Sequence, residues 1–180
     1  QSVFTLYAHL SAILVLQDQR VNTGDVIGLI GNTGNVSGPH VHFEVRIGRN
    51  SYFAVRNPVL WIAPYAGRGT IVGRITTADE QPIYDIPINV IDLATGRITH
   101  QTTTYAGFGV NPDDNWNENF VIPDVPAGHY LVTCRYGATT WSGEVEVIAG
   151  ATGWVNMERH VPTAPGSDSD ERDGAGVADD

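Results

Sequence analysis

The chain has 180 residues, of which 42% are hydrophobic and 17% charged, and its formal net charge is −10. This composition is typical of folded globular proteins, and the length allows one large domain or two small ones. All ten basic residues are arginines and none is lysine. An acidic chain without a basic patch is a poor candidate for binding nucleic acid.

The cysteine count excludes an intramolecular disulfide, and the apolar run at residues 12–16 is too short for a membrane-spanning segment. The single cysteine, Cys134, rules out an intramolecular disulfide. The apolar run at residues 12–16 is far too short to span a bilayer. No signal peptide is present, and the chain opens without methionine inside an alternating segment, so we expect any targeting segment upstream of Gln1.

The first region, residues 1–64, has short β-type runs and no sustained helical period. The pattern predicts strands at residues 3–10, 12–16, 25–31 and 40–47. Proline and glycine then mark a linker at residues 65–69.

The second region, residues 70–160, has regularly spaced strands separated by turn residues. We expect seven strands, at residues 70–77, 86–92, 97–104, 119–125, 129–137, 142–150 and 154–160. Seven short strands in about ninety residues predict a β-sandwich of the immunoglobulin or transthyretin type. Residues 161–180 are acidic and nearly free of large apolar groups, so we expect a disordered tail. The predicted fold class is therefore all-β.

The segment "GPHVHFEV" places two histidines two residues apart in a predicted strand. Residues i and i+2 of a strand point to the same face, so His40, His42 and Glu44 share one side. Val41, Phe43 and Val45 share the other side and form the expected core-facing set. Two imidazoles about 7 Å apart on one face can converge on one ion or substrate, and neutral imidazole is a good zinc ligand. An exposed strand that happens to carry two histidines is the alternative.

An ordered series of motifs resembles the lysostaphin-type, or LytM-like, zinc metallopeptidases that cleave peptidoglycan peptides. The series begins with the "YAHL" element at residues 7–10 and continues with "VNTGDVIGLIG" at 21–31 and "NTG" at 32–34. It ends with "GPHVHFE" at 38–44 and "NP" at 57–58. The 21–31 segment also looks like the barrel-sandwich hybrid motif of lipoyl domains. The resemblance implies that residues 1–64 are the C-terminal part of such a peptidase domain. A lipoyl-type carrier is disfavoured because the chain has no lysine to modify.

The resemblance also implies roles for three histidines. His42 would bind the catalytic Zn²⁺, while His40 and His9 would be catalytic, acting on the attacking water or the transition state. The family's other zinc ligands come from an upstream HxxxD element, and no histidine here is followed four residues later by aspartate. We therefore expect the remaining ligands upstream of Gln1 and little or no activity from this piece alone. The implied parent is a bacterial peptidase of the cell envelope or the extracellular space, with peptidoglycan peptides as substrate. The alternative function is a non-catalytic module that binds the cell wall or regulates another hydrolase.

The second region resembles carboxypeptidase-regulatory-like sandwiches, through "GRITTADEQPIYDIPINV" and "NFVIPDVPAGHYLVTCRYG". Such sandwiches serve as spacers, stability modules or adhesion contacts, and no catalytic constellation is evident here. Between these motifs, Asp113, Asp114 and Glu118 could bind calcium, but a solvated hairpin loop is the preferred interpretation. We expect at least one of Trp116 and Trp141 to pack in the core.

Overall fold

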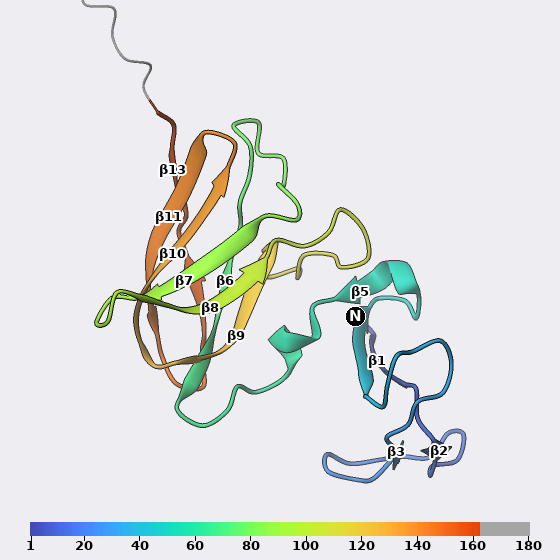
Figure 1. Cartoon of the computed structure of the whole chain (residues 1–180). Helices are drawn as coiled ribbons and strands as arrows, with labels where there is room; N and C mark the ends of the chain where they lie inside the picture. The colour runs from blue at the N-terminus through green and yellow to red at the C-terminus, as the bar shows by residue number, and fades with distance from the viewer. Residues whose placement is uncertain (163–180) are drawn as a thin grey trace, which may run out of the picture.

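The computed structural model describes residues 1–162 (Figure 1). Within that range it has thirteen strands and two short 3₁₀ helices but no α-helix, so the predicted all-β fold class is confirmed. None of the helical turns in residues 1–162 has the length or hydropathy needed to cross a bilayer. The tail predicted to be disordered is residues 161–180, of which residues 163–180 lie outside the described residues.

The first part of the chain contains one three-stranded sheet and one two-stranded ribbon. Its strands are β1 (Val3–Ala8), β2 (Ala12–Ile13), β3 (Gly28–Leu29), β4 (His42–Ile47) and β5 (Val55–Arg56). β4 lies between β1 and β5, and β2 pairs with β3. The 3₁₀ helices η1 (Tyr52–Ala54) and η2 (Pro58–Trp61) follow β4 and β5. In Figure 1 the β2–β3 ribbon lies at the end of the molecule farthest from the sandwich.

Two of the predicted strands are much shorter than expected. The runs at 12–16 and 25–31 pair over only two residues each, Ala12 with Leu29 and Ile13 with Gly28. In the turns between β2 and β3, side chains accept hydrogen bonds from backbone amides. The Leu16 amide donates to the Gln19 side chain, and the Asn22 amide donates to the Asp25 carboxylate. These side-chain bonds compete with the ladder and end the ribbon early.

The second part is a two-sheet sandwich of eight strands. These are β6 (Arg68–Gly73), β7 (Pro87–Asp92), β8 (Arg97–Thr103), β9 (Phe120–Pro126), β10 (Gly128–Tyr136), β11 (Thr139–Val147), β12 (Thr152–Val155) and β13 (Glu158–His160). One sheet has the order β13-β11-β10-β7-β8 and the other β12-β6-β9. The single strand expected at 154–160 is in fact two, because β12 pairs with β6 in one sheet and β13 pairs with β11 in the other.

Alternation along the strands builds the core between the two sheets. On β10, Tyr130, Val132 and Cys134 are buried while their neighbours are not. Trp141 joins this core, which confirms that at least one tryptophan packs inside. Burial raises the pKa of the Cys134 thiol to about 11, so it carries almost no thiolate at neutral pH and is a structural residue.

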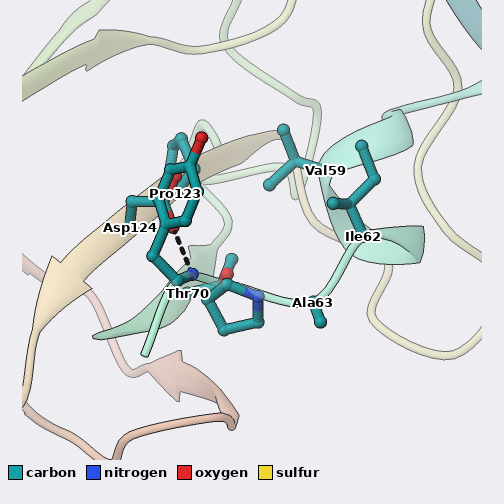
Figure 2. A pocket seen from close by; sticks show the side chains of 8 residues that line it. Val59, Ile62, Ala63, Thr70, Pro123 and Asp124 are labelled. Atoms are coloured by element: carbon teal, nitrogen blue, oxygen red, sulfur yellow. Dashed lines mark hydrogen bonds between the residues drawn. The ribbon is translucent and has the colours of Figure 1, made fainter. Parts of the chain in front are cut away.

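A bulge in β9 fastens the linker to the sandwich. The β6–β9 register shifts between Gly69 and Ile71, and Asp124 adopts a φ of 52° there. The Asp124 carboxylate accepts a hydrogen bond of 2.9 Å from the Tyr65 amide, drawn dashed in Figure 2. Its backbone carbonyl accepts one of 2.6 Å from Arg68. The bulge also forms one wall of a shallow, mainly apolar cavity of about 340 Å³ whose other wall includes Ile62.

The loop between β8 and β9 is not the solvated hairpin that its acidic sequence suggests. Glu118 is fully buried, and its carboxylate accepts bonds from the Tyr105 hydroxyl (2.7 Å) and the Asp113 amide (3.0 Å). Burial and the neighbouring Glu118 charge raise the pKa of Tyr105 far above its usual range. Both Glu118 oxygens therefore serve as internal acceptors that hold the loop in shape.

The same loop docks onto the first part of the chain. The Asn111 amide donates to the Val55 carbonyl at 2.9 Å, and its side chain donates to the carbonyls of Phe53 and Val55. Arg56 forms an ion pair of 2.8 Å with Asp114. Because β5 is adjacent to β4 in the sheet, this loop supports the strand that carries His42.

Truncating the core at Phe120 should destabilise the sandwich strongly. Phe120 is fully buried, and Phe→Ala changes in cores cost about 3–5 kcal/mol because they lose transfer energy and leave a cavity. Phe108 is 84% exposed, so Phe108→Ala should change the free energy of unfolding by less than about 0.5 kcal/mol. Urea denaturation of both variants checks this, and equal losses would contradict the assigned core.

Removing the Asn111 side chain should loosen the docked loop. Asn111→Ala deletes two hydrogen bonds worth about 1 kcal/mol each. Hydrogen exchange at the residue 111 amide, which bonds to Val55, should then quicken about 5- to 30-fold. The matched control is Asn115→Ala at an exposed position of the same loop, where no such change is expected.

Candidate active site

The candidate site is built on the antiparallel pairing of β1 and β4. Ala8 is opposite His42, so the residue that follows β1, His9, emerges beside the beginning of β4. His40 forms an isolated bridge with Gly31 just before β4 begins. The pairing thus brings together residues that are about thirty positions apart in the sequence.

The three histidines predicted to act together are adjacent in space. The ring centroids of His9 and His40 are 4.9 Å apart, and those of His9 and His42 are 5.4 Å apart. The other histidines of the described chain, His100, His129 and His160, lie in β8, β10 and β13 of the sandwich. Within residues 1–162 the structure therefore separates a cluster of three histidines from the three histidines of the sandwich.

The glycine-rich loop holds His9 in an uncommon backbone conformation. His9 has a φ of 61°, in the left-handed region that few non-glycine residues adopt. Its Nδ1 lies 2.8 Å from the Thr33 carbonyl, and the Thr33 hydroxyl donates to the Leu10 carbonyl. Gly31 passes so close that a Cβ there would lie 2.3 Å from the Ser11 amide nitrogen and 2.7 Å from the His9 carbonyl.

His42 is hydrogen-bonded to a row of polar side chains on the same face of β4. Its Nε2 lies 2.8 Å from the Glu44 carboxylate, which also accepts two bonds from Arg46, at 2.8 and 2.7 Å. Burial raises the pKa of the Glu44 carboxyl, but hydrogen bonds and charge from Arg46 and His42 outweigh burial and keep that pKa below its ordinary value. Glu44 is therefore ionised at neutral pH.

The hydrogen bonds also define which nitrogen of each ring is free. A carbonyl oxygen has no proton to give, so the ring nitrogen that faces it carries the proton. His9 and His40 each face a carbonyl through Nδ1, and His42 faces an ionised carboxylate through Nε2. In the neutral rings, Nε2 of His9, Nε2 of His40 and Nδ1 of His42 thus have lone pairs available for a metal or a proton.

The described residues contain no complete metal site. No group of three or more His, Cys, Asp or Glu side chains in residues 1–162 has the arrangement that would hold a metal ion. The donor chemistry at His42 fits a metal ligand, because an anchored ring with one free nitrogen is the usual form of a ligating histidine.

One part of the expected strand face is wrong. Val45 is fully buried as predicted, but Val41 is 45% exposed and is not a core residue. β4 begins only at His42, so Val41 precedes the paired region and has no partner strand to pack against.

Three residues that contact the cluster were not predicted from the sequence: Arg46 and Asn50 behind Glu44, and Thr33 beside His9. The Arg46 guanidinium donates to Glu44 and to the Asn50 side chain, the latter at 2.8 Å. Continuing the i, i+2 alternation from His42 through Glu44 would have placed Arg46 on the same face. The Thr33 contact depends on loop conformation, which no sequence periodicity indicates.

Comparisons with known proteins find relatives for the first part of the chain. Peptidase family M23 matches residues 1–54, the segment that contains all three clustered histidines. The chain is 58% identical over 41 residues to the peptidoglycan DD-endopeptidase ShyA of Vibrio cholerae, covering 23% of this chain and 10% of that protein. It is 56% identical over 45 residues to the DD-carboxypeptidase/endopeptidase Mpg of Neisseria meningitidis, covering 25% and 10%.

A third relative is a protein of Buchnera aphidicola named as an uncharacterized metalloprotease, 52% identical over 44 residues, covering 24% of this chain and 12% of that protein. The chain spans about a tenth of the length of these relatives. No solved structure is significantly similar to it. The first part of the chain is thus similar to metallopeptidases.

Adding one methyl group at Gly31 should disturb the His9 loop. The Gly31→Ala Cβ would collide with backbone atoms, which cannot move aside as a flexible side chain can. We expect a loss of about 1–3 kcal/mol, as for other overpacking changes, together with a shift of the His9 ring signals in NMR spectra. Gly38→Ala is the matched control, since nothing lies within 4 Å of a Cβ there. Equal effects of the two substitutions would contradict the close approach.

Proposed function

We propose that residues 1–64 are the C-terminal part of a zinc metallopeptidase domain that hydrolyses peptide bonds of peptidoglycan. The observation that carries this proposal is the clustering of His9, His40 and His42, with ring centroids 4.9 and 5.4 Å apart, inside the segment that matches Peptidase family M23. The names of the relatives support peptidoglycan as the substrate class.

In this proposal His42 is a metal ligand, and its ring is fixed by Glu44. Zinc, when bound, supplies a Lewis acid that lowers the pKa of a bound water and polarises the scissile carbonyl. His40 and His9 present free Nε2 atoms, because the Gly38 and Thr33 carbonyls hold their Nδ1 atoms. Each of these rings can accept a proton from the attacking water or donate a hydrogen bond to the developing oxyanion once protonated.

The remaining ligands are proposed to come from outside these 180 residues. The chain has no HxxxD element, and residues 1–162 contain no three-residue metal cluster. A catalytic zinc site usually has three protein ligands. The chain alone is therefore expected to release negligible product from peptidoglycan, even with added Zn²⁺.

A non-catalytic module that binds the cell wall or regulates another hydrolase is the second candidate, and it would apply if the gene product as a whole lacks the ligands that residues 1–162 do not supply. Both candidates place the protein in the bacterial envelope or the extracellular space. Residues 70–160 are proposed as a carboxypeptidase-regulatory-like sandwich that serves as a spacer or stability module. Its β8–β9 loop supports this role, because it contacts the strand next to β4.

The full product of the gene that encodes this chain should hydrolyse purified peptidoglycan in a zinc-dependent way. His42→Ala should remove zinc binding and activity together. His40→Ala should lower kcat about 10²- to 10⁴-fold, as loss of a general base does, and leave zinc content unchanged. Released muropeptides and metal content are the two measurements, and His129→Ala in β10 is the control that should change neither.

Two outcomes would decide against parts of the proposal. A folded gene product that binds the cell wall but shows no zinc-dependent cleavage would favour the non-catalytic module. Robust turnover by the 180-residue chain itself would show that the ligand set is completed within it.

A further inference from the structure

Behind His42, a row of hydrogen-bonded side chains crosses one face of β4 and ends at Asn50. The contacts run from His42 Nε2 to Glu44 Oε1 (2.8 Å), from Glu44 Oε2 to Arg46 Nε (2.8 Å), and from Arg46 to Asn50 Oδ1 (2.8 Å). Alternation along the strand puts the first three side chains on one face. The row is thus a local product of the sequence "HFEVRIGRN".

Arg46 and Glu44 each have only one hydrogen-bonding role available. A guanidinium has donors and no acceptor, so Arg46 requires oxygen atoms from both Glu44 and Asn50. An ionised carboxylate accepts only, so Glu44 requires a proton on the nitrogen of His42 that faces it. Glu44 and Arg46 are shielded, with side chains only 11% and 13% exposed, so water does not readily replace either partner.

We propose that Glu44, oriented by Arg46 and Asn50, is a positioning residue that fixes the tautomer of His42 with the proton on Nε2. The lone pair on Nδ1 is thereby kept free before any metal arrives. His9 and His40 are held in the opposite tautomer, because carbonyls face their Nδ1 atoms. That Nδ1 of His42 then ligates zinc rests on the proposed function; the tautomer itself does not.

A single isosteric substitution, Glu44→Gln, should reverse the tautomer of His42. In Glu44→Gln the side chain has one oxygen and one NH₂ group. Arg46 can donate only to the amide oxygen, which leaves the NH₂ group facing His42. The NH₂ group must then donate to Nε2, and the ring proton moves to Nδ1. The row thus predicts a change of tautomer where a merely structural role for Glu44 predicts none.

The experiment is ¹⁵N NMR of the ring nitrogens in the metal-free 180-residue chain with labelled histidine. It is run over a series of alkaline pH values, and the tautomers are read where the ring signals no longer change with pH. Protonated and unprotonated ring nitrogens have well-separated shifts, and single His→Gln variants assign the signals. The wild type should show His42 protonated on Nε2 while His9 and His40 are protonated on Nδ1. Finding His42 protonated on Nδ1 would overturn the proposal with no substitution needed.

In Glu44→Gln, His42 should switch to Nδ1–H while His9 and His40 stay as they were. The matched control, Glu146→Gln, makes the same change at an exposed position of β11 and should alter none of the three rings. An unchanged His42 in folded Glu44→Gln would overturn the proposal.

The metal consequence is tested separately on the full gene product. There Glu44→Gln should weaken Zn²⁺ binding about 10- to 100-fold, as loss of a hydrogen-bonding partner of a ligating histidine does, measured by chelator competition. A gene product that binds no zinc would overturn the proposed function, while the tautomer result on the metal-free chain would stand.

Discussion

The antiparallel ladder between β1 and β4 is the constraint on which the candidate site depends. It fixes Ala8 opposite His42 and so determines where the chain leaves β1 at His9. A slip of one residue would turn every side chain of β4 to the other face and move His42 away from His9. The buried Val45, opposite Thr5, anchors this register. The geometry of the candidate site therefore depends on the register between β1 and β4.

Much of this arrangement follows from periodicity. Alternation placed His42 and Glu44 on one face, and the spacing of turns predicted the sandwich and most of its strands. The comparisons match the first 54 residues to the peptidase family that the motifs resemble. Patterns of this kind succeed because a strand has a fixed period of two, so local sequence determines which side chains share a face.

The features that the sequence did not reveal depend on contacts between distant segments. The acidic loop before β9 has the composition of a solvated turn, yet Glu118 is buried because Tyr105 supplies a donor from another strand end. The runs at 12–16 and 25–31 look like full strands, but they pair over two residues each, and side chains of the intervening turns bind the amides of Leu16 and Asn22. The strand predicted at 154–160 divides because its two halves pair in different sheets. Composition carries no information about such partners.

The docked loop has a consequence for how this protein can be rearranged. Asn111 belongs to the sandwich in sequence, but its side chain donates to one carbonyl in η1 and one in β5, next to the strand that carries His42. A recombinant chimera that joined these first 56 residues to another sandwich would leave those carbonyls without their donor. The first 56 residues and the sandwich therefore cannot be exchanged independently of each other. A chimera that contains the first 56 residues has to include the β8–β9 loop as well, or provide another amide group at the position of Asn111.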